Sequence, residues 1–138
     1  MAKVNIIYWS GTGNTEQMAN LIAKGALGTG HSVNVLNVSN ATVVNAKEAD
    51  ILVLGSPAMG AEVIEEYEME PYINEIESFV KGKKVALFGS YGWGGGEFMA
   101  EWTNRMKSYG ANIVGSITVQ YAPESDESMR CIEFGAKL

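Results

Sequence analysis

The sequence has few of the residues that build disulfide frameworks and metal sites. It contains one cysteine, Cys131, and one histidine, His31. A single cysteine excludes an internal disulfide and fits a reducing compartment, and a lone histidine has no neighbouring candidate with which to share a metal. The chain also has no long apolar run and no charged leader followed by an apolar stretch. We therefore expect a cytoplasmic protein without a metal ion or a membrane anchor.

Positive charge is scarce as well. The chain carries 10 Lys and Arg residues against 16 Asp and Glu residues, which gives a formal net charge of −6. Lysine and arginine are absent between Lys3 and Lys24, and again between Glu48 and Val80. This balance argues against nucleic acid or an anionic membrane as a partner and favours basic protein surfaces.

Strands and helices are expected to alternate along a chain whose 138 residues suit a single domain over residues 1–138. The apolar run at residues 50–55 is typical of a strand that is buried on both faces. This alternation predicts an α/β fold with a parallel, doubly wound sheet. The expected strands cover residues 4–9, 32–38, 50–55, 83–89 and 112–119, and the longer helices end near residues 28, 80, 109 and 137.

The segment Ser10-Gly11-Thr12-Gly13-Asn14-Thr15 lies where the first strand turns into the first helix. The first N–H groups of a helix have no internal partner and lie at the positive end of its dipole, so they bind anions. The Gly-Lys-Ser/Thr ending of a nucleotide triphosphate loop and the G-x-G-x-x-G dinucleotide pattern are both absent. We therefore predict a site for a terminal monophosphate held by neutral donors, the alternative being an ordinary capped turn.

Two later loops share a pattern. The stretches Gly55-Ser56-Pro57-Ala58-Met59-Gly60 and Gly89-Ser90-Tyr91-Gly92-Trp93-Gly94 each place a large polarizable side chain four residues after a glycine that ends a strand. In a parallel sheet these loops meet the first one at the carboxyl edge. Met59 and Trp93 on either side of a slot suit a flat aromatic ligand; the alternative is that both side chains pack into the core.

Together these stretches carry a resemblance to a known family. Tyr8 to Thr15, Pro57 to Gly60 and Gly89 to Gly94 resemble the motifs of flavodoxins, specifically the short-chain clostridial type, in the family's order and spacing. The resemblance runs essentially from end to end. It implies a flavodoxin-like three-layer sandwich whose five-stranded parallel sheet has the order 2-1-3-4-5, with FMN bound non-covalently.

The resemblance also implies roles for single residues. Ser10, Thr12, Asn14 and Thr15 would hold the FMN phosphate together with the amides of residues 11–15. Met59 and Trp93 would cover the two faces of the flavin ring, the Gly60 carbonyl would turn toward N5 of the one-electron-reduced flavin, and Glu62 would bind N3–H. The expected cofactor-binding residues are Ser10, Gly11, Thr12, Gly13, Asn14, Thr15, Pro57, Ala58, Met59, Gly60, Glu62, Ser90, Tyr91, Gly92 and Trp93.

The implied function is that of a low-potential one-electron carrier that works through the semiquinone/hydroquinone couple and is not itself an enzyme. Carboxylates crowd the segment after Met59, at Glu62, Glu65, Glu66, Glu68 and Glu70. A unit charge about 10 Å from the reduced flavin costs on the order of 1.7 kcal/mol at an effective dielectric near 20, so each carboxylate lowers the potential by tens of millivolts. We expect reductases and oxidoreductases to dock on this acidic face of a monomer.

Some positions depart from the clostridial pattern. Pro57 lacks the hydroxyl of a serine, Ala61 stands where aspartate is common, and Phe98 replaces a tryptophan. None of them removes a residue on which flavin binding depends. Two other functions remain open, namely a small quinone or flavin reductase that uses a nicotinamide cofactor, and a partner that activates one metalloenzyme.

Overall fold

Five parallel strands form one sheet with the order β2-β1-β3-β4-β5 in the computed structural model, which describes residues 2–60, 62–92 and 94–138. The strands are β1 (Lys3–Tyr8), β2 (Ser32–Asn37), β3 (Ile51–Gly55), β4 (Lys84–Tyr91) and β5 (Asn112–Gln120). The α-helices are α1 (Asn14–Gly28), α2 (Val43–Lys47), α3 (Met69–Ile76), α4 (Glu97–Ser108) and α5 (Ser125–Ala136). Short 3-10 turns follow β2, at Val38–Asn40, and α3, at Glu77–Phe79.

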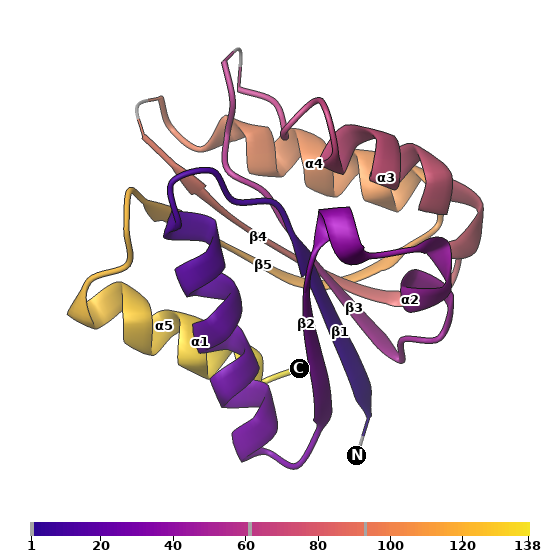
Figure 1. The fold of residues 1–138 in the computed structure, drawn as a ribbon, viewed down its shortest axis with the longest axis horizontal. Helices are drawn as coiled ribbons and strands as arrows, with labels where there is room; N and C mark the ends of the chain where they lie inside the picture. Colours follow the sequence, from indigo (N-terminus) through magenta and orange to yellow (C-terminus); the bar gives the residue numbers. More distant parts are fainter. Residues whose placement is uncertain (1, 61, 93) are drawn as a thin grey trace.

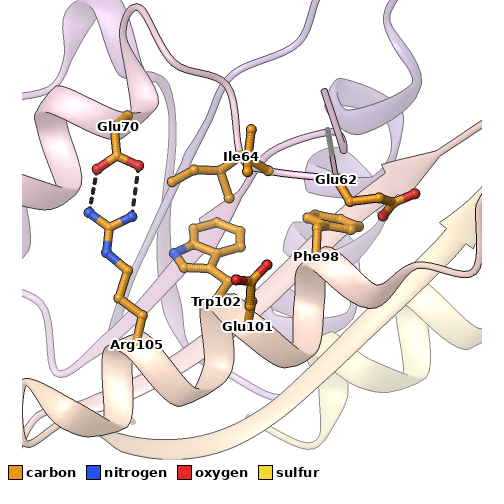
Figure 2. Close-up of a pocket in the computed structure, with 8 residues that line it drawn as sticks. Glu62, Ile64, Glu70, Phe98, Glu101, Trp102 and Arg105 are labelled. Carbon is orange, nitrogen blue, oxygen red and sulfur yellow. Dashed lines mark hydrogen bonds and ion pairs between the residues drawn. The ribbon is translucent and has the colours of Figure 1, made fainter. Parts of the chain in front are cut away.

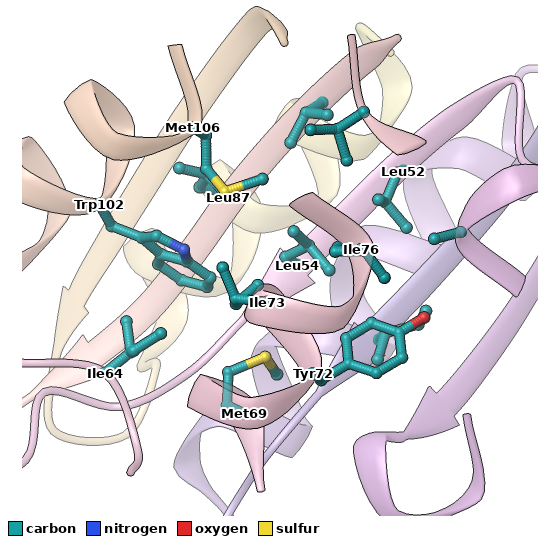
Figure 3. Packing of buried hydrophobic residues seen from close by; sticks show 14 of the residues in the cluster. Leu52, Leu54, Ile64, Met69, Tyr72, Ile73, Ile76, Leu87, Trp102 and Met106 are labelled. Carbon is teal, nitrogen blue, oxygen red and sulfur yellow. The ribbon is translucent and has the colours of Figure 1, made fainter. Parts of the chain in front are cut away.

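The helices cover both faces of the sheet. Figure 1 shows α1 and α5 together on one face, and α2, α3 and α4 on the other. Because side chains alternate along a strand, β1 sends Ile6 into the cluster under α1 and α5 and Ile7 into the cluster under α3 and α4. The second cluster is closely packed around Leu54, Ile73 and Trp102 (Figure 3). The sheet therefore has a buried core on each side, as the sequence predicts for a doubly wound fold.

Helices α1 and α5 cross at two glycines. A Cβ atom built on Gly25 would lie 1.9 Å from the carbonyl oxygen of Ile132, and one built on Gly135 would lie 1.9 Å from the carbonyl oxygen of Ile22. Only hydrogen at these positions allows the two backbones to approach so closely. Cys131 is buried at this interface, where loss of solvation raises the pKa of its thiol to about 11. It is a packing residue of this interface.

Strand β4 is longer than the sequence predicts. Ser90 and Tyr91 were expected in the loop after the strand, but they pair with Val119 and Gln120 of β5. The pairing with an edge strand that continues in parallel extends β4 by two residues, and no local pattern in the glycine-rich stretch shows it. The other predicted elements are confirmed, with ends that shift by one or two residues, except that the helix expected to end near residue 80 ends at Ile76 and is followed by the 3-10 turn Glu77–Phe79.

Candidate functional site

The side chain of Ser10 holds the shape of the loop between β1 and α1. Ser10 Oγ accepts hydrogen bonds from the N–H of Gly13, at 3.1 Å, and from the N–H of Glu16, at 3.3 Å. Gly13 has φ 101°, a left-handed conformation that glycine adopts without strain. The N–H groups of Asn14 and Thr15 open the helix and have no acceptor within it. They form the positive end of α1, as expected of an anion site.

A groove runs from this loop along the carboxyl edge of the sheet. Its first part is a cavity of about 280 Å³. Its second part is a cavity of about 450 Å³ that shares Ala58, Met59 and Gly92 with the first. The lining residues of the two parts are Trp9, Gly11, Thr12, Asn14, Thr15, Pro57, Ala58, Met59, Gly60, Glu62, Ser90, Tyr91, Gly92, Gly94 and Tyr121.

The structure thus brings most of the expected site residues to one groove. Ser10 and Gly13 shape the loop at its end without lining it. Trp93, expected on one face of the flavin ring, and Ala61 lie outside the described residues. Met59 is not a core residue, because its side chain lines the groove and is 37% exposed.

The Met59 turn is held by a short antiparallel bridge. The N–H of Met59 donates to the carbonyl of Val63 at 2.7 Å, and the N–H of Val63 donates to the carbonyl of Met59 at 3.2 Å. Gly60 has φ 42°, in the left-handed region that the sequence analysis expects of a peptide able to reorient. Glu62 has φ 60°, which is strained for a residue with a side chain. That strain was not visible in the sequence.

Glu62 lines the groove with a carboxylate oxygen that accepts no hydrogen bond from the described residues. Its Oε2 atom is buried and has no hydrogen-bond partner among the described residues. Its Oε1 atom lies so close to Gly94 that a Cβ there would be only 1.9 Å away. A buried carboxylate oxygen without a donor is costly unless a ligand supplies one. An N–H at the edge of a flat ring meets that need, so this end of the groove fits FMN.

Glu65 differs from its acidic neighbours, since it is only 2% exposed. Its Oε2 accepts from the N–H of Tyr67 at 2.9 Å, and its Oε1 accepts from the N–H groups of Glu68 and Met69, both at 2.8 Å. Its own N–H donates to Ser56 Oγ at 2.9 Å. Glu65 therefore caps α3 and ties the loop between β3 and α3, residues 56–68, to the end of β3; we call this segment the Met59 loop. This structural role was not among the predictions from the sequence.

The remaining glutamates are also not equivalent. Glu68 accepts from Trp9 Nε1 at 3.1 Å, which joins this loop to the end of β1. Glu70 forms a two-pronged ion pair with Arg105 of α4 (Figure 2). The hydrogen bond from Arg105 holds the pKa of the Glu70 carboxyl below its usual range. Only Glu66 is exposed without a side-chain partner among the described residues.

The far wall of the groove comes from the end of β5. The N–H of Tyr121 donates to the carbonyl of Tyr91 at 2.7 Å, and Gln120 Nε2 donates to the carbonyl of Gly92 at 2.9 Å. Tyr121 has φ 59°, and a Cβ atom built on Gly92 would lie 3.4 Å from its ring. The sequence analysis overlooked this residue although it follows the fifth strand, whose end lies at the same edge of the sheet.

Other kinds of site find no support in the part of the chain that the structure describes. No group of three or more His, Cys, Asp or Glu side chains there could hold a metal ion. None of the described helices is long and apolar enough to cross a membrane.

Comparisons with known proteins agree with this geometry. The flavodoxin family model matches residues 6–135. The chain is 52% identical to a flavodoxin of Clostridium beijerinckii over 98% of both chains, and 42% identical to a flavodoxin of Megasphaera elsdenii over 96% of this chain and 95% of that relative.

A solved structure shows the same arrangement of the backbone. The solution structure of two-electron reduced Megasphaera elsdenii flavodoxin superposes with a TM-score of 0.90 at 41% identity, covering 98% of this chain and 99% of that one. The order of the strands, the family model and the identity over nearly the whole length lead to the same conclusion. The chain belongs to the flavodoxin family, in its short-chain clostridial type.

Proposed function

We propose that the groove holds FMN with its phosphate at the N-terminus of α1 and its ring in the slot beside Met59. Membership of the flavodoxin family makes FMN the cofactor and electron transfer, not enzymatic turnover, the activity. The observation that carries the assignment of residues is one continuous groove. It joins the N-terminus of α1 at one end to a buried carboxylate oxygen of Glu62 at the other, which has no hydrogen-bond partner among residues 2–60, 62–92 and 94–138.

At the phosphate end, neutral hydrogen-bond donors would bind the phosphate, because this segment has no lysine or arginine between Lys3 and Lys24. The hydroxyl groups of Thr12 and Thr15, the Asn14 amide and the backbone N–H groups of Gly11, Thr12, Asn14 and Thr15 would surround the phosphate. These residues line the groove, whereas the N–H of Gly13 is already bound to Ser10 Oγ. Ser10 Oγ already accepts two N–H groups of this loop, so it holds the loop in shape. The dipole of α1 supplies the positive potential that no lysine or arginine provides.

At the ring end, the chain would supply one acceptor, on Glu62, and the peptide of Gly60, whose φ of 42° lies in the left-handed region that glycine tolerates. Bound FMN takes up and releases electrons singly. Glu62 Oε2 would accept the ring N–H, and the carbonyl of Gly60 would turn toward the ring in one redox state. Trp93 would cover the face opposite Met59. A hydrogen bond that exists in only one redox state contributes about 0.5 to 1.5 kcal/mol, which is enough to separate two one-electron steps.

Partner proteins would dock where the groove opens. Four exposed carboxylates lie on the Met59 loop and on α4, and we name them the acidic rim: Glu66, Glu68, Glu97 and Glu101. Tyr67, 88% exposed, stands among them. A surface of this charge attracts basic redox partners in a salt-dependent manner and acts mainly on the rate of association.

Cytochrome c, a basic one-electron acceptor, provides a probe for this surface. We expect the reduced, FMN-loaded chain to reduce it in a stopped-flow experiment with a second-order rate constant that falls roughly tenfold between low and physiological salt. Glu66→Gln combined with Glu101→Gln should weaken that salt dependence. Glu133→Gln, an exposed change on α5, serves as the control. Rates that do not respond to salt would overturn docking on the acidic rim.

Residues 1–138 would act as one FMN-binding domain, as a monomer and in the cytoplasm. A free, buried cysteine fits a reducing compartment. The groove is built from a single copy of the chain, since both of its ends and its far wall come from the described residues of one molecule.

A further inference from the structure

Two buried hydroxyl groups meet where the phosphate end of the groove joins the sheet. Thr15 lies in the first turn of α1, and Ser90 lies near the end of β4. Their side-chain oxygens are 2.9 Å apart, within hydrogen-bonding distance. Thr15 is 1% exposed and Ser90 is 4% exposed, yet both line the groove.

One hydrogen bond uses only one of the two hydroxyl protons. Each hydroxyl has one proton to donate and two lone pairs that accept. The structure shows no second side-chain hydrogen bond for either oxygen among the described residues. The remaining proton therefore needs an acceptor, and a ligand in the groove can supply it.

The negative charge of the phosphate decides which of the two hydroxyl groups donates the hydrogen bond between them. If Thr15 donated to Ser90, the lone pairs of Thr15 would face an anion at the start of α1, and they would repel it. If Ser90 donates to Thr15, the proton of Thr15 is free to point at a phosphate oxygen. A hydroxyl that accepts one hydrogen bond is also a stronger donor in the next.

Ser90 is well fixed for such a role. The carbonyl of Ser90 accepts a hydrogen bond from the N–H of Ala58 at 2.8 Å, and Ser90 pairs with Val119 of β5 in the sheet. The backbone of Ser90 is thus held by the Met59 loop and by β5, while its side chain reaches the phosphate loop. The position of the Ser90 hydroxyl relative to the Thr15 hydroxyl is therefore fixed by the backbone.

We propose that Ser90 is a positioning residue for the phosphate: its hydroxyl donates to Thr15, which in turn donates to the FMN phosphate. The inference rests on the proposed function, because it takes the anion at α1 to be that phosphate. It assigns to Ser90 a contact with Thr15 in place of the direct contact with the cofactor that the sequence analysis expects.

Binding of FMN and of riboflavin, which has the same ring and ribityl chain without the phosphate, separates the possibilities. Ser90→Ala removes a neutral hydroxyl–hydroxyl hydrogen bond, so it should raise the Kd of FMN about 3-fold to 10-fold and leave the Kd of riboflavin nearly unchanged. Thr15→Val removes the charge-assisted bond to the phosphate and should raise the Kd of FMN about 10-fold to 30-fold, and the double variant should lose little more than Thr15→Val alone. The phosphorus NMR signal of bound FMN should shift in Ser90→Ala.

Ser116→Ala, an exposed change on β5, is the matched control and should alter neither Kd. Ser90→Cys, with a weakly donating thiol, gives the same comparison if Ser90→Ala does not fold. An equal loss for FMN and riboflavin would overturn the proposal in favour of a direct contact of Ser90 with the ring or ribityl chain. An unchanged FMN affinity would also overturn it. Failure of the unsubstituted chain to bind FMN would instead overturn the proposed function.

Discussion

Glu65→Ala is expected to lower the free energy of unfolding by about 3 kcal/mol and to weaken FMN binding at least about tenfold. The substitution leaves three backbone N–H groups at the start of α3 without their acceptor. It also loosens the turn between Glu62 and α3, because the Glu65 carboxylate holds the N–H groups of that turn, whereas the bond from the backbone N–H of Glu65 to Ser56 Oγ is kept. Denaturant unfolding and a fluorescence titration with FMN measure the two effects.

The neighbouring residue gives a matched control. Glu66→Ala removes the same charge from the next position, but Glu66 is exposed. We expect its free energy of unfolding to stay within about 0.5 kcal/mol of the unsubstituted chain. If Glu65→Ala and Glu66→Ala behaved alike, Glu65 would be one more surface charge and the capping role would be wrong.

Gly25→Ala is expected to lower the midpoint of thermal unfolding by about 10 °C. The added methyl group would meet the carbonyl of Ile132 on α5, and backbone cannot move aside as a flexible side chain can. Overpacking usually costs about 1 to 3 kcal/mol, and a clash with backbone at this distance is expected to cost about 4 kcal/mol, so a net loss of about 3 kcal/mol remains after the gain of about 1 kcal/mol that alanine brings to a helix. For a domain of this size, about 3 kcal/mol corresponds to roughly 10 °C.

Gly28 provides the comparison within the same helix. A Cβ atom there would meet nothing within 4 Å, so Gly28→Ala should unfold at the same temperature or slightly higher. Differential scanning calorimetry of both variants, with and without FMN, shows whether the loss arises in the fold itself. A Gly25→Ala variant as stable as Gly28→Ala would mean that α1 and α5 separate at little cost.

Local patterns were enough to predict much of this molecule. The apolar run at residues 50–55 and the turn from strand to helix at Ser10 to Thr15 depend on neighbours in the sequence, so β3 and the turn into α1 were predictable. Local patterns alone leave the order of the strands open, because a run of alternating elements fits more than one order. The resemblance to flavodoxins supplied that order, and the structure confirms it.

Contacts between distant segments were the part that sequence could not supply. Glu65 appears in the chain as one of five similar glutamates, and only its burial against the start of α3 distinguishes it. Gly25 and Gly135 are separated by most of the chain, and nothing near either glycine shows that it lies against the backbone of the other's helix. Tyr121 could have been found, because any residue after the fifth strand lies at the carboxyl edge of a parallel sheet.

The central claim is that this chain binds FMN and changes its redox state one electron at a time. The most direct test is to load the purified chain with FMN and record its visible spectrum during stepwise anaerobic reduction with dithionite. We predict two separated one-electron steps, with a long-wavelength absorption band that rises in the first step and disappears in the second. A single two-electron step, or a chain that cannot be loaded with FMN, would contradict the account.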